Sequence, residues 1–428
     1  MIKIDAASDT PFCGWKILFL AAFSQFVSVG FTVYLLGLYL QPLAETFSAT
    51  PGQLGWASSI FMLVSAGLGP LLGYWADRGQ VKGLMTLGAV CLASGFVLLS
   101  ACGNLVHAAL ICIFLIAPGA ALIGMVTAGA MLSQWFEKRR GLALGIAAAG
   151  MSLGGFIMPS VAAWLFEAFG WRVSSMVFGI VIALTLLPCA WFIAVAKPAD
   201  IGQFPDGVKP EASGDHVRLD QDIPNAATFS VLLARADFWL ITVTVGTLSF
   251  SSISIITYLI PFAREQGIDL QTSAFMLSVY AGMAFFGKFL YGWLADRFSP
   301  ARLLTSVAAV MAVGLLPMLV LNSLLVFVVS ICVIGLGVGG LMPIWATLVA
   351  SSFGPQAFGK VKGAMSLVLT SVSVIPGPLG GYIYDWKGSY GMTFTVVLWV
   401  LVLGMVVSLI LPTLKNNNTF VARCNPAK

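Results

Sequence analysis

Apolar residues are distributed along the chain in long blocks separated by short polar segments, and strict alternation with polar residues is absent. A membrane-spanning helix needs about 20 consecutive, mostly apolar residues, and each block reaches that length within a few residues. The pattern therefore predicts an all-α membrane protein with twelve transmembrane helices. The expected spans are 16–41, 52–75, 83–102, 105–135, 141–168, 173–196, 234–262, 271–294, 302–321, 323–351, 362–384 and 390–412.

Two short motifs recur in the chain. GYWADR at 73–78 is similar to GWLADR at 292–297, and FEKRRG at 136–141 is similar to FGKVKG at 358–363. The offsets, about 219 and 222 residues, agree and indicate an internal duplication of the kind seen in transporters with parallel repeats. We therefore expect two pseudo-symmetric six-helix halves. They cover 1–196 and 234–428, the second with a short tail, and are joined by a flexible linker at 197–233.

Composition supports a membrane protein. Hydrophobic residues make up 59% of the chain and charged residues only 9%, whereas soluble domains are about 25% charged. The net charge of +5 does not indicate nucleic-acid binding, because about eighteen of the Lys and Arg residues fall on one side of the membrane if both termini are cytoplasmic. Only Arg172, Arg264 and Lys387 fall outside. We expect a multi-pass protein of a bacterial inner membrane, a monomer, with the lipid bilayer as its surroundings.

Cysteines and histidines show no pattern of a metal or catalytic site. The seven cysteines include no C-x-x-C, and His107 and His216 have no nearby ligand or nucleophile in the sequence. We therefore expect no metal, no cofactor and no enzymatic activity.

GYWADRGQVK and GWLADRFSPAR resemble the two copies of the G-x-x-x-D-R loop signature of the major facilitator superfamily. Glycine permits close approach of helices, and an aspartate can face the positive N-terminus of a neighbouring helix. The resemblance implies a gate at the cytoplasmic side, and the alternative is simple anchoring by positive charge. The residues in question are Gly73, Asp77, Arg78, Gly292, Asp296 and Arg297.

A narrower resemblance lies in QWFEKRRGLALGIAAAGMSLGG, which is similar to the fifth-span signature of monocarboxylate porters and their bacterial oxalate/formate-type relatives. It implies transport of a small organic anion, a monocarboxylate, by alternating access. One alternative is a proton-coupled porter of the same superfamily for another small molecule, such as a drug, a siderophore or a metabolite. A membrane receptor that transports nothing is the alternative from another class, although it would be expected to carry a larger domain outside the membrane.

Lys288 is the one Lys or Arg residue expected deep inside a span, away from its ends. It lies eight residues before Asp296, roughly 12 Å from the end of its helix, where a lysine costs about 2.5–3.5 kcal/mol and usually faces a water-filled cavity. The resemblance matches it to an intramembrane arginine of the porters, which implies that it neutralises the substrate carboxylate; the alternative is a lysine that snorkels to the surface. Ala284 stands where the family has a proton-coupling aspartate. Three modes of transport therefore stay open: anion exchange, uniport, and coupling to a proton carried on Lys288.

Other substrate-binding candidates are polar residues in spans that line the cavity of the superfamily or lie beside it. They are Tyr34, Tyr258, Gln25 and Ser371. The glycine-rich stretches at 141–155 and 335–340 are interpreted as helix interfaces and not as phosphate loops, because no strand precedes them. Two prolines in PGPLGG at 376–381 predict a bend in the eleventh span. The substrate, the direction of transport and the coupling ion have no local motif in the sequence.

Overall fold

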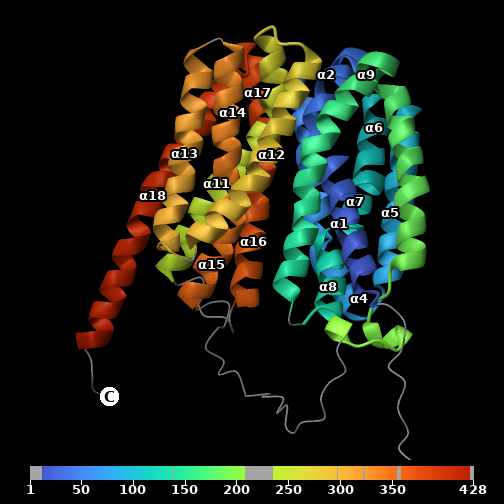
Figure 1. The fold of residues 1–428 in the computed structure, drawn as a ribbon. Coiled ribbons are helices and arrows are strands. Elements are labelled where there is room, and N and C mark those ends of the chain that lie inside the picture. Colours follow the sequence, from blue (N-terminus) through green and yellow to red (C-terminus); the bar gives the residue numbers. More distant parts are fainter. Residues whose placement is uncertain are drawn as a thin grey trace, which may run out of the picture.

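The structure is a computed structural model. It describes residues 12–137, 139–207, 235–295, 297–321, 323–353 and 358–424, without the side chains of 77, 140, 358–360 and 411–424. The described part is all helical, as expected (Figure 1).

Eleven segments are long and apolar enough to cross a membrane, and their bounds agree with the expected spans within a few residues. One of them, Gly141–Ile193, has 53 residues. At about 1.5 Å per residue it is far too long for one crossing of a hydrocarbon layer about 30 Å thick. Its backbone leaves helical geometry at Gly170, where φ is 76° and ψ is 161°. The described chain is therefore consistent with the twelve expected spans.

The helices follow in chain order, and several spans consist of two pieces. The first half contains α1 (Gly14–Gly30), α2 (Leu36–Phe47), α3 (Pro51–Gly67), α4 (Gly69–Asp77), α5 (Val81–Ser100), α6 (Leu105–Ile111), α7 (Ala117–Leu122), α8 (Met125–Trp135) and α9 (Arg140–Ile193). The second half contains α11 (Ala236–Glu265), α12 (Leu270–Ala295), α13 (Pro300–Val320), α14 (Leu324–Gly339), α15 (Leu341–Phe353), α16 (Phe358–Val374), α17 (Pro376–Lys387) and α18 (Gly391–Cys424).

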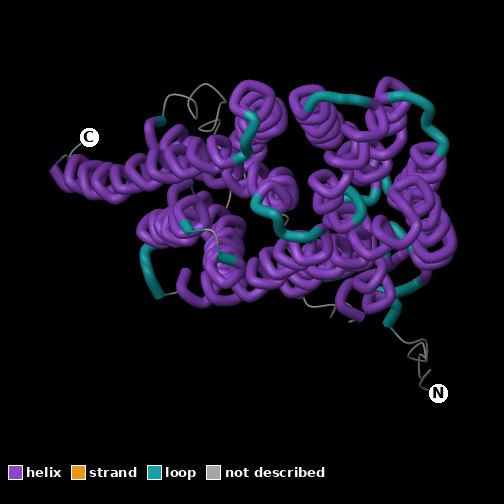
Figure 2. The backbone as a smooth tube through the Cα atoms, turned by 90° about the horizontal axis from the view of Figure 1, so that it is seen from above, coloured by secondary structure: helices purple, strands orange, loops and turns teal. Residues whose placement is uncertain are grey.

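The two halves lie side by side (Figure 1), and the view along the helices shows each as a cluster of packed helices (Figure 2). The linker begins at the lower end in Figure 1, which we call the linker end. The opposite end, where α2 and α17 lie, is called the far end. Each half contributes helices to a long seam between them, and this seam holds the site described below.

Helix breaks occur where the backbone has a physical reason to leave the helix. The eleventh span breaks at Ile375, directly before Pro376, which confirms the predicted bend. The first span breaks into a short 3-10 turn at Val33–Leu35, and the fourth breaks at Ile123–Gly124. Irregular backbone is tolerated at membrane depth only where protein or a cavity satisfies it. Here the carbonyl of Ile123 accepts a hydrogen bond from Gln25 Nε2 at 3.2 Å.

Glycines in the two glycine-rich stretches, 141–155 and 335–340, lie at helix contacts, as interpreted from the sequence. A Cβ on Gly154 would lie 2.6 Å from the carbonyl oxygen of Phe26 on α1, and one on Gly335 would lie 2.5 Å from that of Tyr280 on α12. Contacts this close exclude any side chain larger than hydrogen. These glycines therefore fix how α1 packs on α9 and how α12 packs on α14.

The first residues of the linker are packed against the first half. Asp206 Oδ2 accepts a hydrogen bond from the backbone N–H of Glu137 at 3.0 Å, and Gln203 Oε1 accepts one from that of Cys13 at 3.0 Å. The expectation of a flexible tether is therefore wrong for 197–207, which forms two 3-10 turns at the linker end. The rest of the predicted linker lies outside the described residues.

Candidate functional site

The far end of the seam is closed by glycines of both halves. A Cβ on Gly55 of α3 would meet the carbonyl oxygen of Gly377 on α17, and one on Gly381 would meet that of Pro51. On the neighbouring pair of helices, a Cβ on Gly37 would lie 2.6 Å from the carbonyl oxygen of Thr257. The backbones of the two halves therefore touch at this end, and nothing larger than a hydrogen atom separates them.

Polar groups add to this closure. The indole Nε1 of Trp56 donates to the hydroxyl of Tyr382 at 2.9 Å, and Ser59 donates to the carbonyl of Val374. The carboxylate of Asp385 accepts a hydrogen bond from the N–H of Gly52 at 3.1 Å. Gly52 lies in the first turn of α3, so this carboxylate also faces the positive end of the helix dipole.

The linker end of the seam lacks such contacts among the described glycines. A Cβ on Gly292 would meet no atom within 4 Å, and one on Gly73 would meet only a methyl of Val126, in its own half, at 4.0 Å. The close helix approach expected at these two glycines is therefore absent in this conformation. Arg78 stacks on Tyr74 at 4.0 Å and Arg297 on Trp293 at 3.9 Å, each on its own helix. Asp296 and the side chain of Asp77 lie outside the described part.

Lys288 lies in the middle of the seam. It extends from α12 of the second half to α9 of the first, where its Nζ donates to Ser152 Oγ at 2.6 Å and to the carbonyl of Ala148 at 3.5 Å. Among the described carboxylates, none is within ion-pair distance of it. The side chain is half-buried and seven residues from the end of α12, so its charge sits well inside the hydrocarbon layer.

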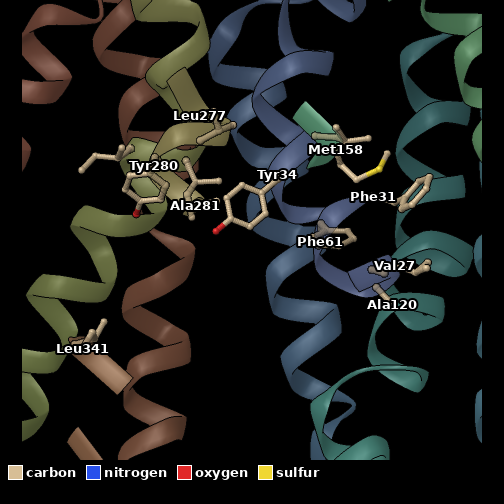
Figure 3. Packing of buried hydrophobic residues seen from close by; sticks show 14 of the residues in the cluster. Val27, Phe31, Tyr34, Phe61, Ala120, Met158, Leu277, Tyr280, Ala281 and Leu341 are labelled. Carbon is tan, nitrogen blue, oxygen red and sulfur yellow. The ribbon is translucent and has the colours of Figure 1, made fainter. Parts of the chain in front are cut away.

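Tyr34 and Tyr280 face the seam from opposite halves, and Figure 3 shows Tyr34 directed toward Tyr280 and Ala281. The break in the first span carries Tyr34, whose ring fills the space that a Cβ on Gly155 would need. The hydroxyl of Tyr280 is 2.8 Å from Ser252 Oγ on α11. These aromatic rings form a floor on the far side of Lys288, since Gly155 is nearly one helical turn farther along α9 than Ser152.

Three other candidates are placed elsewhere. Gln25 is buried between α1 and the broken fourth span. Tyr258 is buried at the far end, where its hydroxyl donates to the carbonyl of Gly377. Ser371 is exposed and donates to the carbonyl of Leu367 on its own helix at 3.3 Å. Of the five residues expected to bind substrate, the structure thus brings Lys288 and Tyr34 to the middle of the seam.

Sequence reasoning missed two members of this site. Ser152 lies within the glycine-rich stretch that was interpreted only as a helix interface. Tyr280 precedes Ala284 and Lys288 at intervals of four residues, a spacing that places all three along one stripe of a helix. The stripe was a usable signal for Tyr280, whereas the pairing of Ser152 with Lys288 joins positions 136 apart. Ala284 itself is buried against Gly339 of α14.

Comparison with known proteins identifies the class. The family model of the Major Facilitator Superfamily matches residues 18–378 and 244–423, so the chain belongs to this superfamily of transporters. It is a membrane transport protein and not an enzyme.

Individual relatives match most of the chain, but at low sequence identity. The chain is 25% identical to rat monocarboxylate transporter 12 over 418 residues, which cover 92% of this chain and 84% of that protein. It is 26% identical to bovine monocarboxylate transporter 13, and the match covers 93% of this chain and 89% of that protein. It is 24% identical to the uncharacterized MFS-type transporter YcxA of Bacillus subtilis, and the match covers 87% of this chain and 89% of that protein. A bacterial homologue of the human lysosomal transporter Spinster, solved in an inward-facing unoccupied conformation, shares the fold with a TM-score of 0.70 at 17% identity, covering 95% and 96%.

Proposed function

We propose that the protein is a secondary transporter that carries a small organic anion, a monocarboxylate, across the membrane by alternating access. The observation that carries the proposal is Lys288, a cation inside the membrane, at the contact between the two halves, without a carboxylate partner among the described residues. An unpaired charge at this depth is costly and is usually retained for function. The carboxylate of a substrate would supply the missing partner.

The state of the seam supports alternating access. If the linker end and both termini are cytoplasmic, as the distribution of Lys and Arg indicates, the closed far end makes this an inward-facing conformation. Opening to the other side then requires the glycine contacts at Gly55 and Gly381 to part, and the linker end to close. We propose that the two G-x-x-x-D-R loops, with Asp77 and Asp296, hold that second closure. A monomer in a bacterial inner membrane would suffice for this cycle.

We further propose that the transporter exchanges anions, or responds only weakly to a proton gradient. Ala284 provides no carboxylate, and no Asp or Glu is expected deep in any span. A bound anion and Lys288 neutralise each other, so the loaded site can move through the low-dielectric layer without an additional proton.

The test is uptake of labelled lactate, pyruvate, formate and oxalate into proteoliposomes, with and without unlabelled anion inside. We expect at least one monocarboxylate to enter, faster when the vesicles contain anion. Lys288→Ala should abolish uptake at normal abundance, and Lys288→Arg should keep part of it because the charge is preserved while its shape changes.

Lys197→Ala is the control, since Lys197 also bears a charge but is exposed at the start of the linker segment, outside the membrane-spanning helices. This variant should transport at the unmodified rate. Transport of the anions by Lys288→Ala at the unmodified rate would refute the anion site. Accumulation driven by a proton gradient alone, into empty vesicles, would refute exchange.

A further inference from the structure

The N-terminus of α3 has one backbone donor that its own residues do not satisfy. The first turn of a helix leaves its N–H groups without partners inside the helix. Here Thr50 and Gln53 form a capping box: the hydroxyl of Thr50 accepts from the N–H of Gln53, and the amide oxygen of Gln53 accepts from the N–H of Thr50. Pro51 has no N–H. The N–H of Gly52 therefore needs a partner from another part of the chain.

The second half provides that partner. Asp385, near the end of α17, accepts the hydrogen bond from the N–H of Gly52 through its Oδ2, at 3.1 Å. A Cβ on Gly52 would overlap this oxygen, so the carboxylate reaches the backbone only because residue 52 is glycine. The capped helix thus belongs to one half and the cap to the other. Opening of the far end separates them.

Asp385 brings a negative charge to this contact. The hydrogen bonds described beside it at the far end join neutral groups. Among the described residues, no Lys or Arg lies within ion-pair distance of Asp385, and the neighbouring Lys387 stacks on Trp386 at 4.0 Å. A negative charge at a helix N-terminus is stabilised by the helix dipole. The N-terminus of α3 is therefore the described group that complements this charge.

We infer that Asp385 is a charge latch between the two halves: its carboxylate caps α3 while the far end is closed, and its charge shifts the conformational equilibrium toward that state. The closed state gives the charge a helix N-terminus and the N–H of Gly52, whereas an open far end leaves it to water. The inference rests on the proposed alternating access, in which the far end opens. An anion arriving from the far side binds the open fraction, so the latch also weakens apparent binding from that side.

The test measures how often the far end opens, in protein without substrate. Ser58 of α3 is buried in this contact, facing Gly377, so the thiol of Ser58→Cys reacts with a maleimide when the halves part. In a background without the native cysteines, the labelling rate in lipid nanodiscs at low maleimide concentration follows the open fraction. Asp385→Asn keeps the shape and an acceptor oxygen but removes the charge. We expect it to make labelling roughly two- to fivefold faster.

Further variants test the mechanism. Asp385→Ala also removes the acceptor of the Gly52 N–H and should speed labelling roughly tenfold. Gly52→Ala displaces the carboxylate, so adding Asp385→Asn to it should change the rate less than twofold. Asp269→Asn is the matched control. Its carboxylate accepts the N–H of Thr272 at 2.8 Å, at the N-terminus of α12, but both residues belong to the second half. This control should label at the parent rate.

The outcomes separate the latch from the proposed function. If Asp385→Asn leaves labelling unchanged, or if Asp269→Asn speeds it equally, Asp385 is no latch, whether or not the protein transports anions. The proposed function depends instead on anion uptake and its loss in Lys288→Ala. A protein that labels as expected but takes up none of the anions would retain the latch and refute the anion transporter.

Discussion

At the scale of single residues, the proposed anion site depends on the pair formed by Lys288 and Ser152. The 2.6 Å hydrogen bond directs the amine toward α9, and a hydrogen bond to a charged group contributes roughly 1.5–3 kcal/mol. Without it, the flexible four-carbon stem of the lysine could place its charge in many positions. Ser152 therefore acts as a positioning residue for the charge.

We predict that Ser152→Ala raises the KM for the transported anion roughly tenfold or more, since one such hydrogen bond is lost. The rate at saturation should change much less, because the charge of Lys288 remains. Ser152→Thr keeps the hydroxyl and should restore most of the affinity. Initial-rate uptake at varied anion concentration measures both constants. A KM that is the same in all three proteins would contradict the positioning role.

The sequence alone singles out Lys288 as a candidate, because a charge in an apolar block is visible without any structure. It was insufficient for Ser152, which resembles every other serine in a small-residue helix until its partner is known. Tyr258 was predicted to bind substrate because of its polar group, and in the structure its hydroxyl donates to the carbonyl of Gly377 at the broken eleventh span. A polar side chain in a helix can serve the backbone as well as a ligand, and only the contact distinguishes these roles.

At the scale of helices, length and hydrophobicity predicted the spans, and the proline pair predicted the break before Pro376. The breaks at Val33–Leu35 and at Ile123–Gly124 have no comparable signal. They depend on partners from other helices, such as Gln25 at the carbonyl of Ile123. The contacts of α3 with α17 join residues more than 300 positions apart, a separation that periodicity does not address.

At this scale we predict that Gly55→Ala shifts the protein away from the closed far end, because the added methyl overlaps the carbonyl of Gly377. Spin labels placed on the two halves at the far end should show a longer mean distance. Gly67→Ala is the matched control, since a Cβ on Gly67, also on α3, meets nothing within 4 Å. Equal distances in the two variants would show that glycine contact does not hold the far end closed.

At the scale of the whole molecule, the duplication seen in the sequence is reflected in two halves that meet along one seam. The seam contains the closed far end, the aromatic floor of Tyr34 and Tyr280, and Lys288 on the linker side of that floor. In the proposed cycle an anion reaches Lys288 from the linker end while the far end stays closed. Its release on the other side then requires the halves to part where α3 and α17 touch.

If transport requires the far end to open, a covalent link between the two halves at this end should stop it. The side chains of Trp56 and Tyr382 meet across the seam at 2.9 Å, so Trp56→Cys and Tyr382→Cys place one thiol on each half at this contact in a background without the native cysteines. We expect a reducible bifunctional thiol cross-linker to stop anion uptake into proteoliposomes and reduction to restore it, while each single-cysteine protein is unaffected. Full transport by the cross-linked protein would show that the far end need not open for transport.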